Sequence, residues 1–118
     1  MALDRGKLTN VITLGVGQTV AGVTVASNKK VYVKSIMCHA PYSGIASGTA
    51  QVYMVPNSGG SAGTASTSNR IFNVDVYAGE TVLLEPSYPI VIDSTGDTVQ
   101  VGTAATTINF LLTGDKEA

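Results

Sequence analysis

Short segments in which apolar and polar residues alternate constrain this chain more than any other feature. Phe72 and Val74 alternate with Asn73 and Asp75, and a segment near the end of the chain repeats the pattern. A period of two places successive side chains on opposite faces of a strand, so that one face is buried and the other meets water. Glycine, serine and aspartate cluster between these segments, as in residues 94–97, and favour turns.

The pattern predicts strands along most of the chain and no helix. Helix formers spaced at i, i+3, i+4 and i+7 are missing, whereas β-branched residues are common. Val99 and Val101 are expected to face inward, with Thr98 and Gln100 facing outward. The expected strands cover residues 7–14, 19–26, 30–39, 48–55, 70–77, 80–85, 89–92, 97–103 and 106–113. Short strands separated by Gly, Ser and Pro turns indicate an all-β fold, a single antiparallel β-sandwich or jelly-roll-like domain over residues 1–118.

In the segment of residues 30–39, the apolar residues change from odd to even positions. Val31 and Val33 fall on one face of a regular strand, whereas Ile36 and Cys38 fall on the other. An extra residue near 34–35 would return both pairs to the same face, because a β-bulge sets two residues against one on the partner strand. We therefore expect a bulge at this point and all four apolar side chains in the core.

Composition narrows the class of partner. The chain has 118 residues, the size of one domain, of which 44% are apolar and 13% charged. Its net charge of −1 argues against nucleic acid, and Lys29, Lys30 and Lys34 fit a guarded strand edge better than a phosphate-binding patch. No secretory signal opens the chain, and no apolar run approaches the ~20 residues that span a bilayer. We expect no nucleic-acid partner, no membrane partner, and synthesis and retention in a cytosol.

Residues of catalytic type are few and poorly arranged. Cys38 and His39 are adjacent, but consecutive side chains on a strand point to opposite faces, so they do not form a dyad. Cys38 is the single cysteine, which excludes an internal disulfide and fits a buried, unreactive thiol. The chain has no Trp to line a sugar cleft and no carboxylate pair with the spacing of a glycosidase. These residues predict no catalytic site.

The segment from Asp93 to Asp97 is the best candidate for a metal site. Its carboxylates and carbonyls could bind Ca²⁺, but it lacks the dense D-x-D-x-D-G pattern of a calcium loop. Aspartates that accept hydrogen bonds from their own turn explain the pair better. Gly59 and Gly60 lack the lysine and the helix of a phosphate loop, and one histidine cannot make a His-rich metal site. We therefore expect no metal and no cofactor.

Two segments stand out as candidates for contact with other chains. Residues 56–69, PNSGGSAGTASTSN, form a loop longer than the ~2–6 residues of an ordinary connection and carry no apolar anchor. Residues 1–8 are expected to form an extended arm. Ordering such backbone costs ~1–2 kcal/mol per residue, so a neighbouring subunit is expected to hold both segments. The expected interface residues are Leu3, Arg5, Leu8, Pro56, Asn57, Ser61, Thr64 and Asn69.

The order of several segments resembles a known group of proteins. The segments are VKSI (33–36), VYMVPNSGGSAGTA (52–65), NRIF (69–72), AGETVLLE (78–85), PIVIDSTGDTVQV (89–101) and INFLLTG (108–114). Their order is similar to that in small β-sandwich virion structural proteins of tailed bacteriophages, which include head decoration or cement proteins, head fibres and tail-associated domains. The resemblance covers about residues 30–114. It implies a non-enzymatic structural protein and carries over no catalytic or ligand residue.

The resemblance implies a protein that assembles on a capsid or a tail, and within that class we expect capsid decoration, which suits a small, low-charge sandwich. The chain would bind the major capsid protein or another virion protein on the outer capsid surface and stabilise the shell through many weak contacts. It would be a component of the virion, assembled in the host cytoplasm. We expect a homo-oligomer, with a trimer favoured because threefold positions recur on icosahedral shells.

Two other classes of function stay open at this point. The first is a tail- or fibre-associated binding module that recognises a host glycan or receptor through exposed aromatic side chains. The tyrosines that could form such a face are Tyr32, Tyr42, Tyr53, Tyr77 and Tyr88. The second is a small hydrolase, which would require a cleft that gathers His39, Asp93 and Asp97.

Overall fold

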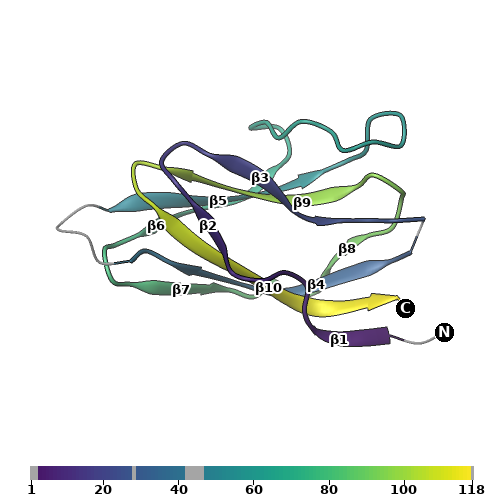
Figure 1. Ribbon diagram of the computed structural model, residues 1–118, viewed down its shortest axis with the longest axis horizontal. Coiled ribbons are helices and arrows are strands. Elements are labelled where there is room, and N and C mark those ends of the chain that lie inside the picture. The colour runs from purple at the N-terminus through teal and green to yellow at the C-terminus, as the bar shows by residue number, and fades with distance from the viewer. Residues whose placement is uncertain (1–2, 28, 42–46, 118) are drawn as a thin grey trace.

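A computed structural model describes residues 3–27, 29–41 and 47–117, and in these ranges it contains ten strands and no helix. The strands are β1 (Leu3–Lys7), β2 (Ile12–Leu14), β3 (Thr19–Thr24), β4 (Val31–His39), β5 (Gly48–Val55), β6 (Arg70–Val76), β7 (Thr81–Leu84), β8 (Ile90–Ile92), β9 (Thr98–Ala104) and β10 (Ile108–Glu117). They form two antiparallel sheets stacked face to face (Figure 1). The expected all-β sandwich is confirmed.

The order of the strands is that of a jelly roll. Sheet A has the order β1-β10-β4-β7, with β2 also paired to β10 and β8 also paired to β4, and sheet B has the order β3-β9-β5-β6. β1 and β2 pair with different parts of β10, and β7 and β8 pair with different parts of β4, so each pair acts as one interrupted strand. Counted in this way, the ten strands become eight. The first of these eight strands pairs with the last, the second with the seventh and the third with the sixth, and the two in the middle form the β5–β6 hairpin. This nested pairing, in which a long hairpin is rolled up into two sheets, is typical of a jelly roll.

The core lies between the two sheets and consists of the alternate residues that face inward. Ile108, Phe110 and Leu112 of β10 are fully buried, and Phe72 and Val74 of β6 are half-buried against the same cluster. The inward faces expected from the period-two pattern are therefore confirmed. β9 departs from the pattern, because Thr98 and Gln100 are buried as well as Val99 and Val101. A loop covers the outer face of this strand, as described below.

The expected bulge in β4 is also confirmed. Thr113 of β10 pairs with Ser35, whereas the next residue, Gly114, pairs with Val33, so Lys34 is the extra residue. The shift returns the apolar side chains on either side of it to one face of the strand. The residues that share this buried face are Val31, Val33, Ile36 and Cys38.

In the structure, most of the extended arm expected over residues 1–8 is an edge strand of the chain's own sheet. Residues 3–7 form β1, which pairs with β10 of the same chain from Leu3 opposite Glu117 to Lys7 opposite Thr113 (Figure 1). Leu8 then packs partly buried against the core, and its N–H donates to the Leu112 carbonyl at 2.8 Å. The edge of β10 would otherwise present unpaired backbone groups, so pairing within the chain satisfies them. The single strand expected over residues 7–14 is not continuous, because β1 ends at Lys7 and β2 begins at Ile12.

Candidate interaction surface

The long loop of residues 56–69 lies on the outer face of sheet B (Figure 1). The Gly63 carbonyl accepts a hydrogen bond from Nε2 of Gln100 on β9, at 3.1 Å. At the far end of the loop, the Met54 N–H donates to the Asn69 carbonyl at 2.9 Å. The loop thus spans the middle of the sheet and returns to the strand that it left. This contact explains why polar residues on the outer face of β9 are buried.

A second set of contacts holds the start of the loop to the turn between β8 and β9. Asp97 Oδ1 accepts hydrogen bonds from the backbone N–H of Asn57 at 2.8 Å and from its Nδ2 at 3.0 Å. Asp97 Oδ2 accepts from the N–H of Ser94 at 3.2 Å, within the turn. Burial alone would raise the pKa of Asp97, but the hydrogen bonds from Asn57 and the turn outweigh it, so the pKa lies below its ordinary value. Asp97 is a turn-forming aspartate, as expected, and it also anchors the loop.

The close approach of the loop depends on a glycine in this turn. Gly96 has a φ of +91°, and a Cβ at this position would lie 2.7 Å from the carbonyl of Gly60. We expected a neighbouring subunit to order the loop, whereas the structure shows contacts within the chain that hold it. That expectation counted apolar area alone, whereas polar groups of the same chain hold the loop in place.

The loop residues expected at an interface divide into two kinds. Pro56, Ser61 and Thr64 are exposed on the outside of the loop and are free to contact another molecule. Asn57 and Asn69 are half-buried, and their side chains hold the loop together through bonds within the chain.

The N-terminal residues expected at an interface lie elsewhere, on sheet A. Leu3 and Arg5 are exposed on β1, and Arg5 Nε lies 3.8 Å from Asp115 Oδ1 on β10. Leu8 belongs to the edge of the core. Because the loop lies on sheet B and β1 lies in sheet A, the structure does not bring the two predicted groups together.

The outer face of sheet A carries an apolar row that sequence reasoning missed. Leu111 on β10 is paired with Met37 on β4, and Met37 is paired with Leu83 on β7. Met37 is 42% exposed and Leu83 is 50% exposed, while Leu111 is half-buried. Each residue is an ordinary apolar side chain on the outward parity of its own strand. Only the register of the sheet sets the three side by side.

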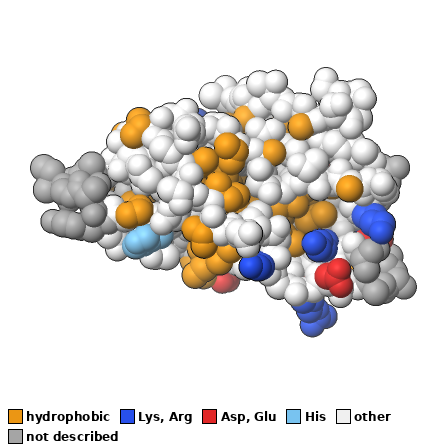
Figure 2. All heavy atoms as spheres, in the orientation of Figure 1, with side chains coloured by type: hydrophobic (Ala, Val, Ile, Leu, Met, Phe, Trp, Pro, Cys, Tyr) orange, Lys and Arg blue, Asp and Glu red, His pale blue; other side chains and the backbone are white. Residues whose placement is uncertain are grey.

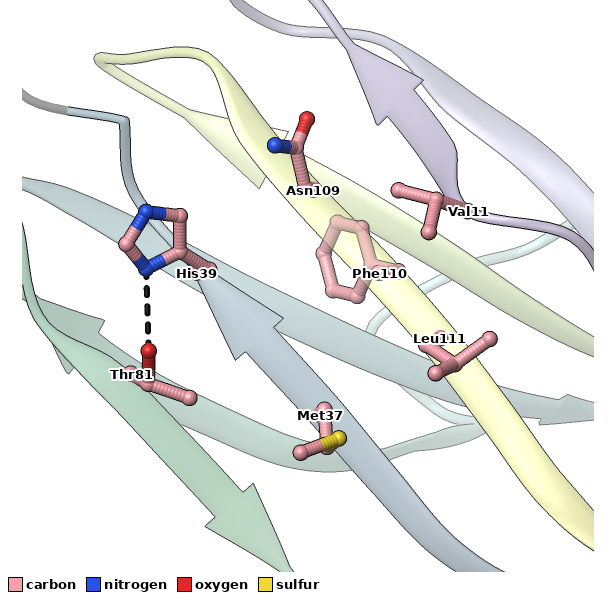
Figure 3. Close-up of a pocket in the computed structure, with 7 residues that line it drawn as sticks. All are labelled: Val11, Met37, His39, Thr81, Asn109, Phe110 and Leu111. Atoms are coloured by element: carbon pink, nitrogen blue, oxygen red, sulfur yellow. Dashed lines mark hydrogen bonds between the residues drawn. The ribbon is translucent and has the colours of Figure 1, made fainter.

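A shallow hollow of about 270 Å³ adjoins this apolar row (Figure 3). His39 and Thr81 close one side of it, with His39 Nδ1 2.9 Å from Thr81 Oγ1. Most of the lining is apolar. The lining residues are Val11, Met37, His39, Thr81, Asn109, Phe110 and Leu111.

Charged side chains are unevenly distributed over the face that Figure 2 shows. Figure 2 shows most of the visible Lys, Arg, Asp and Glu side chains toward the end that holds both chain termini in Figure 1, and apolar side chains across the middle. Lys34 Nζ lies 2.7 Å from Asp115 Oδ2 near that end of sheet A. The apolar row itself contains no charge.

Cys38 and His39, the adjacent residues of catalytic type, lie on opposite faces of β4. Cys38 is fully buried, and burial raises the pKa of its thiol to about 12, so it is neutral at physiological pH. His39 points to the opposite face, where its ring contacts Thr81. Among residues 3–27, 29–41 and 47–117, no three His, Cys, Asp or Glu side chains lie where they could hold a metal ion. The same ranges contain no helix long and apolar enough to cross a membrane.

Comparison with known proteins adds little to this geometry. No family model and no curated protein matches the chain. The chain aligns with part of a structure of infectious bursal disease virus, Gx strain, at 11% identity and a TM-score of 0.42, over 98% of this chain and 30% of the other. A structure of the Gt strain aligns at 10% identity and a TM-score of 0.39, over 97% of this chain and 31% of the other. The chain thus spans about a third of the length of these viral chains, and a likeness of this degree carries no argument about function.

Proposed function

We propose that this chain is a structural protein of a virus particle, a head decoration or cement protein that binds the outer surface of a capsid and stabilises the shell. In this proposal it is not an enzyme. Its partners are the major capsid protein or another virion protein, together with further copies of itself in a homo-oligomer. The resemblance of residues 30–114 to small virion proteins of tailed bacteriophages supports the phage assignment.

The observation that carries the proposal is the loop held down on sheet B. Its backbone is already ordered by Asp97, Gln100 and Asn69, so binding a partner does not cost the entropy of ordering it. Its outer residues, including Pro56, Ser61 and Thr64, are exposed and uncharged. A rigid, uncharged surface can be covered by a partner at a low cost in desolvation. Many copies that each bind weakly in this way would stabilise a shell through avidity.

The architecture supports the class of protein by analogy only. Jelly rolls occur in viral capsid proteins, in lectins and in cupins, and one fold hosts many functions. Lectins and cupins act through ligand or metal sites. The part of the chain that the structure describes holds no cluster of side chains that could bind a metal ion.

Rebinding to undecorated capsids tests the proposal. Purified chain is added to capsids of the virus that encodes it, and bound protein is measured after sedimentation, together with the melting temperature of the shell. We expect saturable binding and a higher shell melting temperature. Ser61→Arg and Thr64→Arg, on the outside of the loop, should weaken binding at least tenfold without changing the stability of the free chain.

The matched control is Ser87→Arg, which changes an exposed serine in the connection between β7 and β8. It should bind capsids as the unchanged chain does. Equal binding by all three variants would show that the loop is not the contact surface. If the unchanged chain neither binds capsids nor alters their stability, the decoration function is wrong.

A second candidate function, recognition of a host glycan or receptor by a tail or fibre, is favoured by two exposed tyrosines. Tyr77 is 61% exposed and Tyr88 is 86% exposed, and the two flank β7. Aromatic faces of this kind stack on sugar rings. Binding on a glycan array that Tyr88→Ala abolishes would support this function over decoration.

A further inference from the structure

We propose that two copies of this chain join through β6, the outermost strand of sheet B, around a two-fold axis that passes beside Val74. The two β6 strands would run antiparallel and continue one sheet into the other. The occupant of this edge is thus the same strand of a second copy. The inference deepens the proposed function, on whose homo-oligomer it rests, and its test is read separately from capsid binding.

β6 is the edge of the sandwich that is best suited to pairing. Among the described residues it pairs with β5 alone, and its seven residues include no proline, glycine or lysine. Natural sheets protect their edges with short strands, charges or bulges. The other edges have these features: β2, β7 and β8 have three or four residues, β1 carries three charged residues, and β3 is bulged at Gly22. The bulge of β6, at Ile71, leaves the strand regular from residue 72 to 76.

The backbone groups of β6 on either side of Val74 point toward the open edge. The Met54 N–H on β5 donates to the Asn69 carbonyl, so Met54 directs its backbone groups to the β6 side. In an antiparallel ladder, alternate residues of a strand direct their N–H and C=O groups to the same side, so Ala50 does so as well. Its partner Val74 therefore bonds within the sheet, and the residues before and after Val74 direct their groups away from β5. Another extended strand is the partner that satisfies such a row.

A two-fold axis beside Val74 sets complementary polar groups opposite each other. Asn73 of each copy faces Asp75 of the other. Because both residues direct their backbone groups outward, these two pairs exchange four backbone hydrogen bonds. Both side chains are exposed on the outer face of the sheet, so the Asn73 amide can also donate to the Asp75 carboxylate of the second copy.

The apolar side chains of β6 match in the same register. On the inner face, Phe72 of each copy faces Val76 of the other. Phe72 and Val74 are only half-buried at this side of the core, so the second strand would cover them. On the outer face, Ile71, which is 43% exposed, faces Tyr77, which is 61% exposed, and such aromatic and β-branched pairs stabilise a sheet. The edge is therefore complementary to itself, as a two-fold contact requires.

The same axis sets the direction of the two long loops of residues 56–69. An axis perpendicular to the sheet keeps the outer faces of both B sheets on one side, so the two loops would face the same way. A dimer would then present two loops to a capsid at once, and binding through both is tighter than binding through one. The contact therefore strengthens the weak binding on which decoration depends.

Disulfide cross-linking tests the register. Val74 would face its own counterpart in a non-hydrogen-bonded pair, in which the two Cα atoms lie ~4.5 Å apart, a distance that a disulfide spans. We expect Val74→Cys to form a disulfide-linked dimer on mild oxidation, seen on a non-reducing gel, since the native Cys38 is fully buried. The matched control is Asn73→Cys, whose thiol would face Asp75 and should not cross-link. No cross-link in Val74→Cys, or an equal one in Asn73→Cys, would overturn the proposal.

Sedimentation equilibrium measures the contact without a covalent link. For the unchanged chain we expect a reversible monomer–dimer equilibrium. Asn73→Lys should tighten the dimer and Asn73→Asp should weaken it, each by about tenfold, because the new charge faces Asp75 of the other copy. The control pair is Thr24→Lys and Thr24→Asp, at an exposed threonine on β3, the opposite edge strand of sheet B. These two should leave the equilibrium unchanged.

The outcomes for the contact and for capsid binding are distinct. A monomer at every concentration up to the millimolar range, a trimer, or equal effects of the Asn73 and Thr24 substitutions would overturn the two-fold contact. A chain that dimerises as expected but does not bind capsids would keep the contact and lose the decoration function. A monomer that binds capsids would do the reverse.

Discussion

Lys34 and Asp115 form an ion pair, with Nζ 2.7 Å from Oδ2, at the point where β4 carries one residue more than β10. Asp115 is only 6% exposed, and its other cation, Arg5, is farther away at 3.8 Å. A bulge leaves its extra residue outside the regular ladder. Here the extra residue supplies the cation that a nearly buried carboxylate needs. The bulge thus has two effects. It places the apolar side chains before and after it on the same buried face, and it brings the Lys34 ammonium to the Asp115 carboxylate.

Replacing Lys34 by alanine should therefore destabilise the fold. Removing one partner of a buried ion pair lowers the free energy of unfolding by ~3–5 kcal/mol. For an ion pair at the surface, the loss is only ~0–1 kcal/mol. Because Lys34 is half-exposed and Arg5 remains, we expect a loss of about 1–3 kcal/mol in urea unfolding. Lys7→Ala is the control, since Lys7 contacts only the exposed Asn10 in the hydrogen bonds described, and it should change stability by less than about 0.5 kcal/mol. Equal effects of the two substitutions would contradict this account of the bulge.

Gly114 faces the bulge and should not tolerate a side chain. A Cβ at this position would overlap the carbonyl of Tyr32 and lie 3.0 Å from the N atom of Lys34. Both neighbours are backbone, so Gly114→Ala must separate β10 from β4 locally. We expect a loss of several kcal/mol or no soluble protein, measured by thermal unfolding. Gly17→Ala, which has a left-handed φ of +74° but open space around it, should cost only about 1–2 kcal/mol.

The contact between Asp97 and the loop should depend on pH in the acid range. The pKa of Asp97 is lowered in the folded chain, so its charge contributes stability above the unfolded pKa of about 3.9. This stability is lost as the pH falls through the folded pKa. The protection of residues 56–69 against hydrogen exchange, taken relative to the intrinsic exchange rate at each pH, should therefore fall below about pH 4 and stay constant between pH 5 and 7. Asp97→Asn should show fast exchange of the loop already at pH 7, whereas Asp93→Asn should behave as the unchanged chain.

Cys38 should react only when the chain unfolds. Burial raises the pKa of its thiol to about 12, so the neutral form is favoured in the folded state. The stability that this contributes is fully present below the unfolded pKa of about 8.5 and is lost as the pH rises through about 12. Labelling by a thiol reagent at pH 8 should be slow in the native state and fast in urea. Rapid native labelling would mean that the strand opens locally and that the thiol is accessible.

The β-sandwich could be predicted from the sequence because the alternation of apolar and polar residues that it requires is a local property. Val31, Val33, Ile36 and Cys38 require a bulge between them if all are to reach the core, and the structure places it at Lys34. Strand boundaries agreed closely in the middle of the chain, as in β5, for the same local reason. The expected core faces of β6 and β10 were likewise correct, and in β9 the inward positions of Val99 and Val101 were correct although Thr98 and Gln100 are buried as well.

Tertiary structure decided everything that depends on pairing between distant residues. Whether residues 3–7 form an arm or an edge strand is set by the free edge of β10, more than a hundred residues away. Whether the loop needs a neighbour is set by Asp97 and Gln100, whose hydrogen bonds cross 40 and 37 residues of sequence. The apolar row exists only because the register aligns Leu111, Met37 and Leu83. Local alternation determines which face of a strand is apolar, whereas only the folded sheets determine which residues stand side by side on that face, because side chains distant in sequence meet only after the strands have paired.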